Sequence, residues 1–241
     1  MTMKKFAVFD VDGTIARSAI FMAVTDELVR AGHLPPEEGK AVEEKYEAYR
    51  QRKHKETFHE YTEASVSALF NHMNKISVKD YRAAVDRVME THKLYSYVFT
   101  RDLIKRLKND GYYLIALSGS EMYGVQQFCE HYGFDLAIGE TYYEKDGFLT
   151  GEAESVIRSK NVLLKKIVEE QGLTYEGSYA VGDSKSDSNM LELVENPIAF
   201  NPEARLLEVA VANNWKIIVE RKNVIYELRP NNGTYELVLE A

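Results

Sequence analysis

The sequence predicts an α/β fold in which a doubly wound parallel sheet carries an inserted α-helical bundle. Residues 4–10 are predicted to form a strand; its residues 6–9 are all apolar and are followed by an acid, which is typical of a central parallel strand buried on both faces. Residues 18–95 have the period of helices throughout. After residue 96, helical and strand patterns alternate, and this alternation indicates a doubly wound sheet. The helical block is therefore an insertion that follows the first strand.

The elements follow in a regular order along the chain. The insertion contains four helical segments, 18–32, 36–50, 56–75 and 77–93. The last of them opens with the capping pattern Ser77-x-x-Asp80. Helices are then expected at 98–109, 121–132, 160–171, 187–194 and 202–213, and strands at 112–118, 135–140, 178–183, 197–200 and 215–220. Turn residues predict hairpins at 145–147 and 231–233. We therefore expect a sheet-containing core of residues 1–16 and 96–241 and an inserted helical domain of residues 17–95.

Composition limits the classes of function. The chain has 241 residues, of which 45% are hydrophobic and 28% are charged, as in an ordinary globular protein. A net charge of −8 argues against a nucleic-acid partner, because such proteins usually carry a basic excess. The apolar run before Asp10 is too short for a signal peptide, and no stretch approaches a membrane span. We expect a cytoplasmic protein with a small-molecule partner, and the oligomeric state stays open.

Several polar residues lie where predicted strands end or where a helix begins. Ligands of an open parallel sheet bind beyond the carboxyl ends of its strands, so these side chains should meet there. Three or four carboxylates without histidine or cysteine select a hard cation, and Mg²⁺ is the usual choice when a phosphate completes its coordination. The predicted metal ligands are Asp10, Asp12 and Asp183, with Asp187 in support, and the predicted phosphate-binding residues are Thr14, Ser118, Gly119 and Lys160.

The phosphate site is predicted from two features. Ser118 is expected at the start of a helix, where the free amides of Gly119 and Ser120 would form an anion pocket. Lys160 would bring a point charge to the same edge. An aspartate beside Mg²⁺ can attack phosphorus, while a second acid protonates the leaving alkoxide and then activates water. Asp10 and Asp12 would divide these tasks.

The motifs FDVDGT and GDSKSD, with the Ser118 strand end and Lys160 between them, resemble the haloacid dehalogenase (HAD) superfamily of phosphohydrolases. The helical insertion and the segment KDGFLTGE resemble its phosphoserine-phosphatase-like branch, in which the insertion caps the active site. The resemblance covers residues 4–220. The resemblance implies that Asp10 is the nucleophile and Asp12 the general acid/base, and that Ser118 and Lys160 bind the phosphate. It also implies that Asp10, the Asp12 carbonyl and Asp183 are the Mg²⁺ ligands. Asp187 would support the metal or Lys160.

These residues predict a Mg²⁺-dependent phosphomonoester hydrolase that acts on a small phosphorylated metabolite through an aspartyl phosphate. A phosphotransferase or phosphomutase shares every residue named and differs only in the group that accepts the phosphoryl. A receiver domain for signalling needs neither the insertion nor the acid at Asp12. A dehalogenase acting on carbon would leave Asp12 and the metal idle. A binding protein without activity would not need the complete set of acids.

Phosphoserine is expected to be a poor substrate. In phosphoserine phosphatases, a glutamate beyond the DxD motif binds the substrate amino group and a cap arginine binds its carboxylate. These positions fall here on Ala19 and Glu63, so we expect an ester whose neutral or cationic part lies near Glu63. A phosphoserine phosphatase remains the alternative. The apolar stripe of the third cap segment is expected in the bundle core; it comprises Phe58, Thr62, Val66, Leu69 and Met73.

Overall fold

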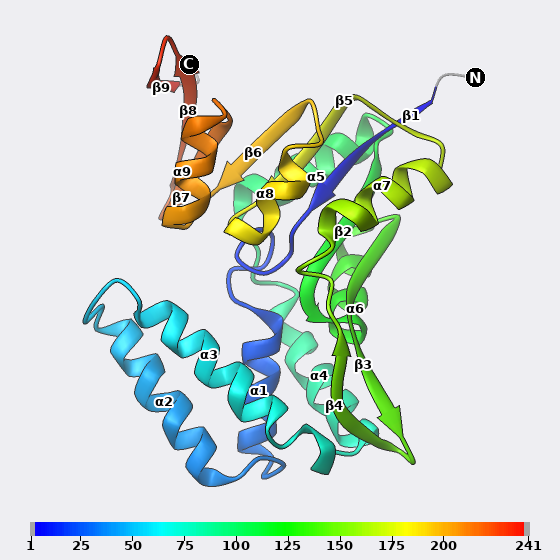
Figure 1. Ribbon diagram of the computed structural model, residues 1–241, viewed down its shortest axis with the longest axis vertical. Helices are drawn as coiled ribbons and strands as arrows, with labels where there is room; N and C mark the ends of the chain where they lie inside the picture. The colour runs from blue at the N-terminus through cyan, green and yellow to red at the C-terminus, as the bar shows by residue number, and fades with distance from the viewer. Residues whose placement is uncertain (1–2, 239–241) are drawn as a thin grey trace.

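The computed structural model describes residues 3–238. It contains one sheet with helices on both faces, and the inserted helices lie beyond the carboxyl ends of the central strands (Figure 1). The strands are β1 Lys4–Phe9, β2 Tyr113–Glu121, β3 Leu136–Lys145, β4 Phe148–Glu154, β5 Leu173–Gly182, β6 Asn196–Phe200, β7 Lys216–Arg221, β8 Val224–Asn231 and β9 Thr234–Val238. The helices are α1 Ile20–Arg30, α2 Pro36–Arg50, α3 Thr57–Phe70, α4 Val78–His92, α5 Val98–Asn109, α6 Met122–Tyr132, α7 Lys160–Glu170, α8 Ser188–Leu191 and α9 Ala204–Ala212.

The strands lie in the order β4-β3-β2-β1-β5-β6-β7-β8-β9. The neighbours from β3 to β7 pair in parallel, and β4, β8 and β9 add antiparallel pairs at the two edges. This arrangement confirms the predicted doubly wound sheet. Between residues 3 and 238, no helix combines the length and the apolar character that a membrane crossing requires.

Alternate residues of β1 divide the interior into two layers. Ala7 and Phe9 face one layer, which contains buried residues of α5 and α6. Phe6 and Val8 face the other, which contains buried residues of α7, α8 and α9. Successive strand side chains point to opposite faces, so an unbroken apolar strand requires a helical layer on each side. β1 is therefore held at the centre of the molecule, and the chain that follows it starts from a rigid position.

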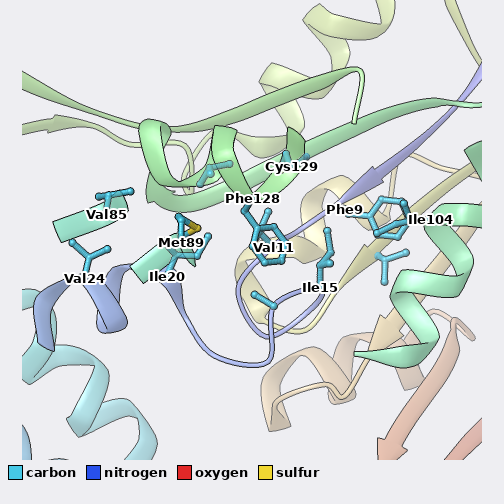
Figure 2. Close-up of a cluster of buried hydrophobic side chains, with 14 of the residues drawn as sticks. Phe9, Val11, Ile15, Ile20, Val24, Val85, Met89, Ile104, Phe128 and Cys129 are labelled. Carbon is cyan, nitrogen blue, oxygen red and sulfur yellow. The ribbon is translucent and has the colours of Figure 1, made fainter. Parts of the chain in front are cut away.

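The four helices of the insertion do not form one uniform bundle. Val85 and Met89 of α4 are buried against α1 and α6 and belong to the main core, as Figure 2 shows. Val42 of α2 and Tyr61 of α3 belong instead to a small separate cluster with Met22 of α1. Figure 1 accordingly shows α2 and α3 farthest from the sheet, with α1 and α4 between. The predicted cap at Ser77 is present, because its hydroxyl accepts the Asp80 amide at 3.0 Å.

The apolar stripe expected on α3 is wrong in part. Leu69 and Met73 are buried, but Phe58 is 53% exposed and Val66 is also exposed. The face that packs inward instead comprises Thr57, Tyr61, Ser65, Ala68 and Leu69. α3 packs against α2 and α1 through small residues and one large tyrosine, so its buried face does not coincide with its most apolar stripe.

Backbone hydrogen bonds also join the insertion to the core. The Arg17 amide donates to the Tyr95 carbonyl at 3.0 Å, so the connections that enter and leave the insertion run side by side. The Val78 amide donates to the Gly147 carbonyl at 2.9 Å, which attaches the start of α4 to the β3–β4 hairpin. The division into core and cap near residues 17 and 95 stays a prediction.

Candidate active site

The site lies at the carboxyl ends of β1 and β5, where the winding of the sheet reverses. The chain runs outward from β1 through β2 to β3 and returns to β5 on the other side of β1. A crevice forms at such a reversal, and Asp10 and Asp183 are the residues that follow the two strands there. Gly13 has a φ of +83°, and a Cβ at this position would collide with the Asp183 carboxylate. Glycine therefore allows the loop after β1 to lie against Asp183.

Lys160 is the first residue of α7, and its side chain is only 2% exposed. Its Nζ lies 2.6 Å from Asp10 Oδ1 and 2.7 Å from Asp187 Oδ1. Burial alone would lower the pKa of the Lys160 ammonium, but the two carboxylates outweigh burial and raise it. Lys160 therefore carries a positive charge within the site at neutral pH.

Asp187 is fully buried and holds the loop after β5. Its Oδ2 accepts the amides of Asp183 at 3.2 Å and Ser184 at 3.0 Å, and also the Ser184 hydroxyl at 3.0 Å. Its Oδ1 is occupied by Lys160. Both oxygens of Asp187 therefore accept hydrogen bonds, from Lys160 or from the loop at Asp183, and the supporting role expected from the sequence stays a prediction.

Asp12 is linked to the start of the insertion and to β2. Its Oδ1 accepts the Ile20 amide of α1 at 2.7 Å, and its Oδ2 accepts the hydroxyls of Ser118 at 3.0 Å and Ser120 at 2.6 Å. The Ser120 hydroxyl was missed by the sequence interpretation, which used only its amide. Ser118 and Ser120 lie on the same side of an extended chain, and this period of two was the available signal.

The expected anion pocket at a helix start is wrong. Ser118, Gly119 and Ser120 belong to β2, and α6 begins only at Met122. The Ser120 amide is not free, because it donates to Ser118 Oγ at 3.0 Å. The segment stays extended because its hydroxyls bind Asp12. Gly119 lies on the pocket wall, whereas the buried Thr14 hydroxyl donates to Asp183 Oδ1 at 3.4 Å. A phosphate-binding role for these residues stays a prediction.

The carboxylates fit a divalent cation. Asp10, Asp183 and Asp187 each offer an oxygen within 4.8 Å of the others. Asp10 Oδ2 is buried and has no hydrogen-bond partner among residues 3–238. Burial raises the pKa of Asp10 to about 7 despite the attraction of Lys160, and burial likewise raises the pKa of Asp183. The carboxylates of Asp10, Asp12, Asp183 and Asp187 outnumber the ammonium of Lys160, so the acidic groups are in excess, and their oxygens are the donors that Mg²⁺ prefers. The third carboxylate of this cluster belongs to Asp187 and not to Asp12. Asp12 was predicted to bind the cation through its main-chain carbonyl.

A cavity of about 820 Å³ leads from these residues to the outer helices of the insertion. α1 forms one wall with Ala19, Met22, Ala23 and Asp26, which share one helical face. The wall that α2 and α3 contribute, called the far end of the pocket, comprises Glu43, Tyr46, Tyr49, Phe58 and Tyr61. The expectation that Glu63 faces the substrate is wrong. Its side chain is 67% exposed and lies 3.1 Å from His59, because two positions along a helix from the buried Tyr61 is the opposite face.

Comparison with known proteins agrees with this geometry. A family model described as haloacid dehalogenase-like hydrolase matches residues 7–192. The chain belongs to this family. It is 29% identical over 210 residues to a phosphoserine phosphatase of Methanocaldococcus jannaschii, which covers 86% of this chain and 90% of that one. It is 25% identical to a histidinol-phosphatase of Neisseria meningitidis serogroup C, with 90% and 99% covered.

Solved structures support the same branch of the family. A structure described as a phospho-aspartyl intermediate analogue of phosphoserine phosphatase covers 92% of this chain with a TM-score of 0.63 and 25% identity, and 95% of that chain is matched. The predicted resemblance to the phosphoserine-phosphatase-like branch is therefore confirmed. The chain is a phosphatase of the haloacid dehalogenase family.

Proposed function

We propose that the protein is a Mg²⁺-dependent phosphomonoester hydrolase that acts on a small phosphorylated metabolite through an aspartyl phosphate on Asp10. The arrangement around Asp10 carries this proposal. Its carboxylate lines the pocket, one oxygen is bound by Lys160, and the other is buried without a hydrogen-bond partner among residues 3–238. A cation and a phosphate would supply the partners that this oxygen lacks.

Each residue has a distinct part in the proposed reaction. Asp10 attacks phosphorus, the bond from phosphorus to the ester oxygen breaks, and the Asp12 carboxyl group gives a proton to the leaving alkoxide. Asp12 then takes a proton from water as the water attacks the phosphoaspartate, which releases phosphate and restores Asp10. The hydrogen bonds from Ile20 and Ser120 keep Asp12 in place.

Positive charge at the phosphate comes from three sources. Mg²⁺, held by Asp10 and Asp183 with the Asp12 carbonyl, would neutralise charge on the phosphoryl oxygens. Lys160 stays protonated and faces the same group. Arg17 also lines the pocket, with its guanidinium 5.6 Å from the Tyr97 ring, and burial and nearby Asp183 raise the pKa of Tyr97. We assign Arg17 to the phosphate end of the substrate, because it lines the pocket and follows the loop that carries Asp12 and Gly13.

We further propose that phosphoserine is not the preferred substrate. The names of the relatives point to two phosphate esters of amino alcohols, phosphoserine and histidinol phosphate. Phosphoserine carries a carboxylate, and the pocket beyond Ala19 presents Asp26 and Glu43, which would repel it. A phosphoserine phosphatase is the second candidate, because the relatives with that name cover most of the chain.

The test is phosphate release from a panel of esters by the purified protein, with and without Mg²⁺. The panel contains p-nitrophenyl phosphate, phosphoserine and histidinol phosphate. We expect EDTA to stop turnover and Mg²⁺ to restore it, whereas Ca²⁺ restores it poorly because its coordination shell is larger and looser. Added glycerol distinguishes a phosphotransferase, which would form a new ester at the expense of free phosphate. Full activity after exhaustive chelation would contradict the proposal.

A further inference from the structure

Four aromatic rings form a continuous surface at the far end of the pocket. The ring centroids of Tyr46 and Tyr61 are 5.2 Å apart, as are those of Tyr49 and Phe58. Tyr49 and Tyr61 lie 6.2 Å apart and nearly parallel, which joins the two pairs. Tyr46, Tyr49 and Phe58 are partly exposed although they are large, and all four line the cavity. Ring faces carry partial negative charge and attract cations within about 6 Å.

One cation of the chain itself already uses this surface. The Arg50 guanidinium lies 5.9 Å from the centroid of Tyr46, one turn further along α2. Arg50 is absent from the cavity wall, whereas all four rings belong to it. The Tyr46 ring therefore attracts a positive charge that lies outside the cavity, and all four rings contribute to the cavity wall.

Two carboxylates face the same space from different helices. Asp26 projects from α1 and Glu43 from α2, and both line the cavity. Surrounding protein and the nearby Glu43 raise the pKa of Asp26 to about 6. The pKa of the Tyr61 phenol is raised mainly by burial and additionally by Asp26 and Glu43, so the Tyr61 hydroxyl lies near both acids. Within residues 3–238, neither acid is in an ion pair, in contrast to Glu60, which binds Lys45 at 2.8 Å. In the described part of the chain, neither carboxylate is neutralised by a directly bound cation; Lys160, which lines the same cavity, is bound to Asp10 and Asp187.

The distance from the catalytic end follows from α1. The Ile20 amide is hydrogen-bonded to Asp12, and Asp26 lies six residues further along the helix. At 1.5 Å per residue, Asp26 is roughly 9 Å from the start of the helix, and helical side chains lean back toward the N-terminus. A group that contacts Asp26 while its phosphate contacts Asp10 must therefore be separated from that phosphate by several bonds.

We infer that the surface formed by Asp26, Glu43, Tyr46, Tyr49, Phe58 and Tyr61 binds a positively charged group of the substrate. The preferred substrates are then phosphate monoesters of alcohols that carry an ammonium or imidazolium group several bonds from the ester oxygen and no carboxylate. The inference rests on the proposed hydrolase function and adds the class of leaving alcohol to it. The aromatic faces and the two carboxylates attract the cation, and the same carboxylates exclude an acidic head group.

The test compares three esters that differ only at the end of a six-carbon chain. They are 6-aminohexyl phosphate, hexyl phosphate and the phosphate ester of 6-hydroxyhexanoate, each assayed for kcat/KM with Mg²⁺. In the native protein we expect the ammonium ester to exceed hexyl phosphate by about tenfold or more, and the carboxylate ester to be the poorest. The preference, defined as the kcat/KM ratio of ammonium to alkyl ester, is the readout.

Variants then locate the preference. Asp26→Asn and Glu43→Gln should each lower the ratio by about tenfold, since each removes one charge that faces the cation. Tyr49→Leu should lower it less, because leucine keeps the apolar contact but lacks the ring face. Glu63→Gln is the matched control, a carboxylate on α3 that points to solvent, and it should keep the native ratio. Thermal unfolding of each variant checks that it folds.

The outcomes separate this inference from the function on which it rests. Hydrolysis of all three esters with equal kcat/KM, or an unchanged ratio in both Asp26→Asn and Glu43→Gln, would overturn the cation site and leave the hydrolase intact. A fall in the ratio in Glu63→Gln as large as in Asp26→Asn would also overturn it. Failure to hydrolyse any ester, p-nitrophenyl phosphate included, would overturn the proposed function and this inference together.

Discussion

The two ends of the pocket are built in opposite ways. At the sheet, buried charged side chains lie near the carboxyl ends of the central strands and are joined by hydrogen bonds. Lys160, at the start of α7, donates to both Asp10 and Asp187. At the far end, partly exposed rings project from α2 and α3, whose Val42 and Tyr61 are buried with Met22 of α1 in a small separate cluster. We infer that the two ends have different functions. The sheet end holds groups in the position that phosphoryl transfer requires, and the outer helices select the alcohol of the substrate.

Asp10→Asn should have the largest effect. An amide oxygen is a poor nucleophile, so we expect kcat to fall by on the order of 10⁴-fold or more, whichever ester is used. The measurement is kcat for p-nitrophenyl phosphate and 6-aminohexyl phosphate. Asp102→Asn, an exposed acid on α5, is the control and should keep the native kcat. A residual rate near that of the control would remove Asp10 from the mechanism.

Asp12→Asn should have the next largest effect, with kcat reduced by roughly 10²–10⁴-fold through loss of proton transfer. The loss should shrink for an ester with a good leaving group, because p-nitrophenolate needs little protonation. The comparison of kcat/KM for p-nitrophenyl phosphate with kcat/KM for hexyl phosphate measures this difference, because kcat/KM reports the step in which the ester bond breaks and not the later attack of water on the phosphoaspartate. Equal losses for both esters would indicate that Asp12 acts only by positioning.

Stability should separate the two regions as clearly as activity. Met89 of α4 is 1% exposed and part of the main core, so Met89→Ala should lower the free energy of unfolding by about 2–5 kcal/mol. Phe58→Ala on α3 should lower it by less than about 1 kcal/mol, because the ring is largely exposed. Urea unfolding of both variants provides the comparison. Similar losses would mean that the outer helices are packed as firmly as the core.

The smallest expected effect concerns Glu27, which links α1 to α4. Burial opposes ionisation of Glu27, but hydrogen bonds from Arg30 and Arg87 outweigh it, so its pKa lies below the usual value. A depressed pKa in the folded state stabilises the fold above the unfolded pKa, near 4.3, and this stability is lost as the pH falls through the folded value. Glu27→Gln should therefore cost about 1 kcal/mol at neutral pH and less in acid. Thermal unfolding at both pH values is the measurement, and a loss that grows in acid would reverse the assignment.

The sheet end could be predicted from the sequence, because strand periodicity and chain order place Asp10, Lys160 and Asp183 at one edge. The position of Ser118 within a strand could not be predicted, because a serine that caps a helix and a serine that binds Asp12 from a strand have the same local sequence. The far end was predicted poorly. Helical period identifies a face but not its partner, and for that reason Phe58 was placed in the core and Glu63 in the pocket.

The central claim is that Asp10 becomes phosphorylated during turnover. The most direct measurement is mass spectrometry of the peptide containing Asp10 after rapid acid quenching of the protein with Mg²⁺ and p-nitrophenyl phosphate. We expect a phosphoryl group on Asp10 in the native protein and no phosphoryl group on the same peptide of Asp10→Asn. Steady hydrolysis with no phosphorylated peptide at any quench time, or with the phosphoryl group on a different residue, would contradict it.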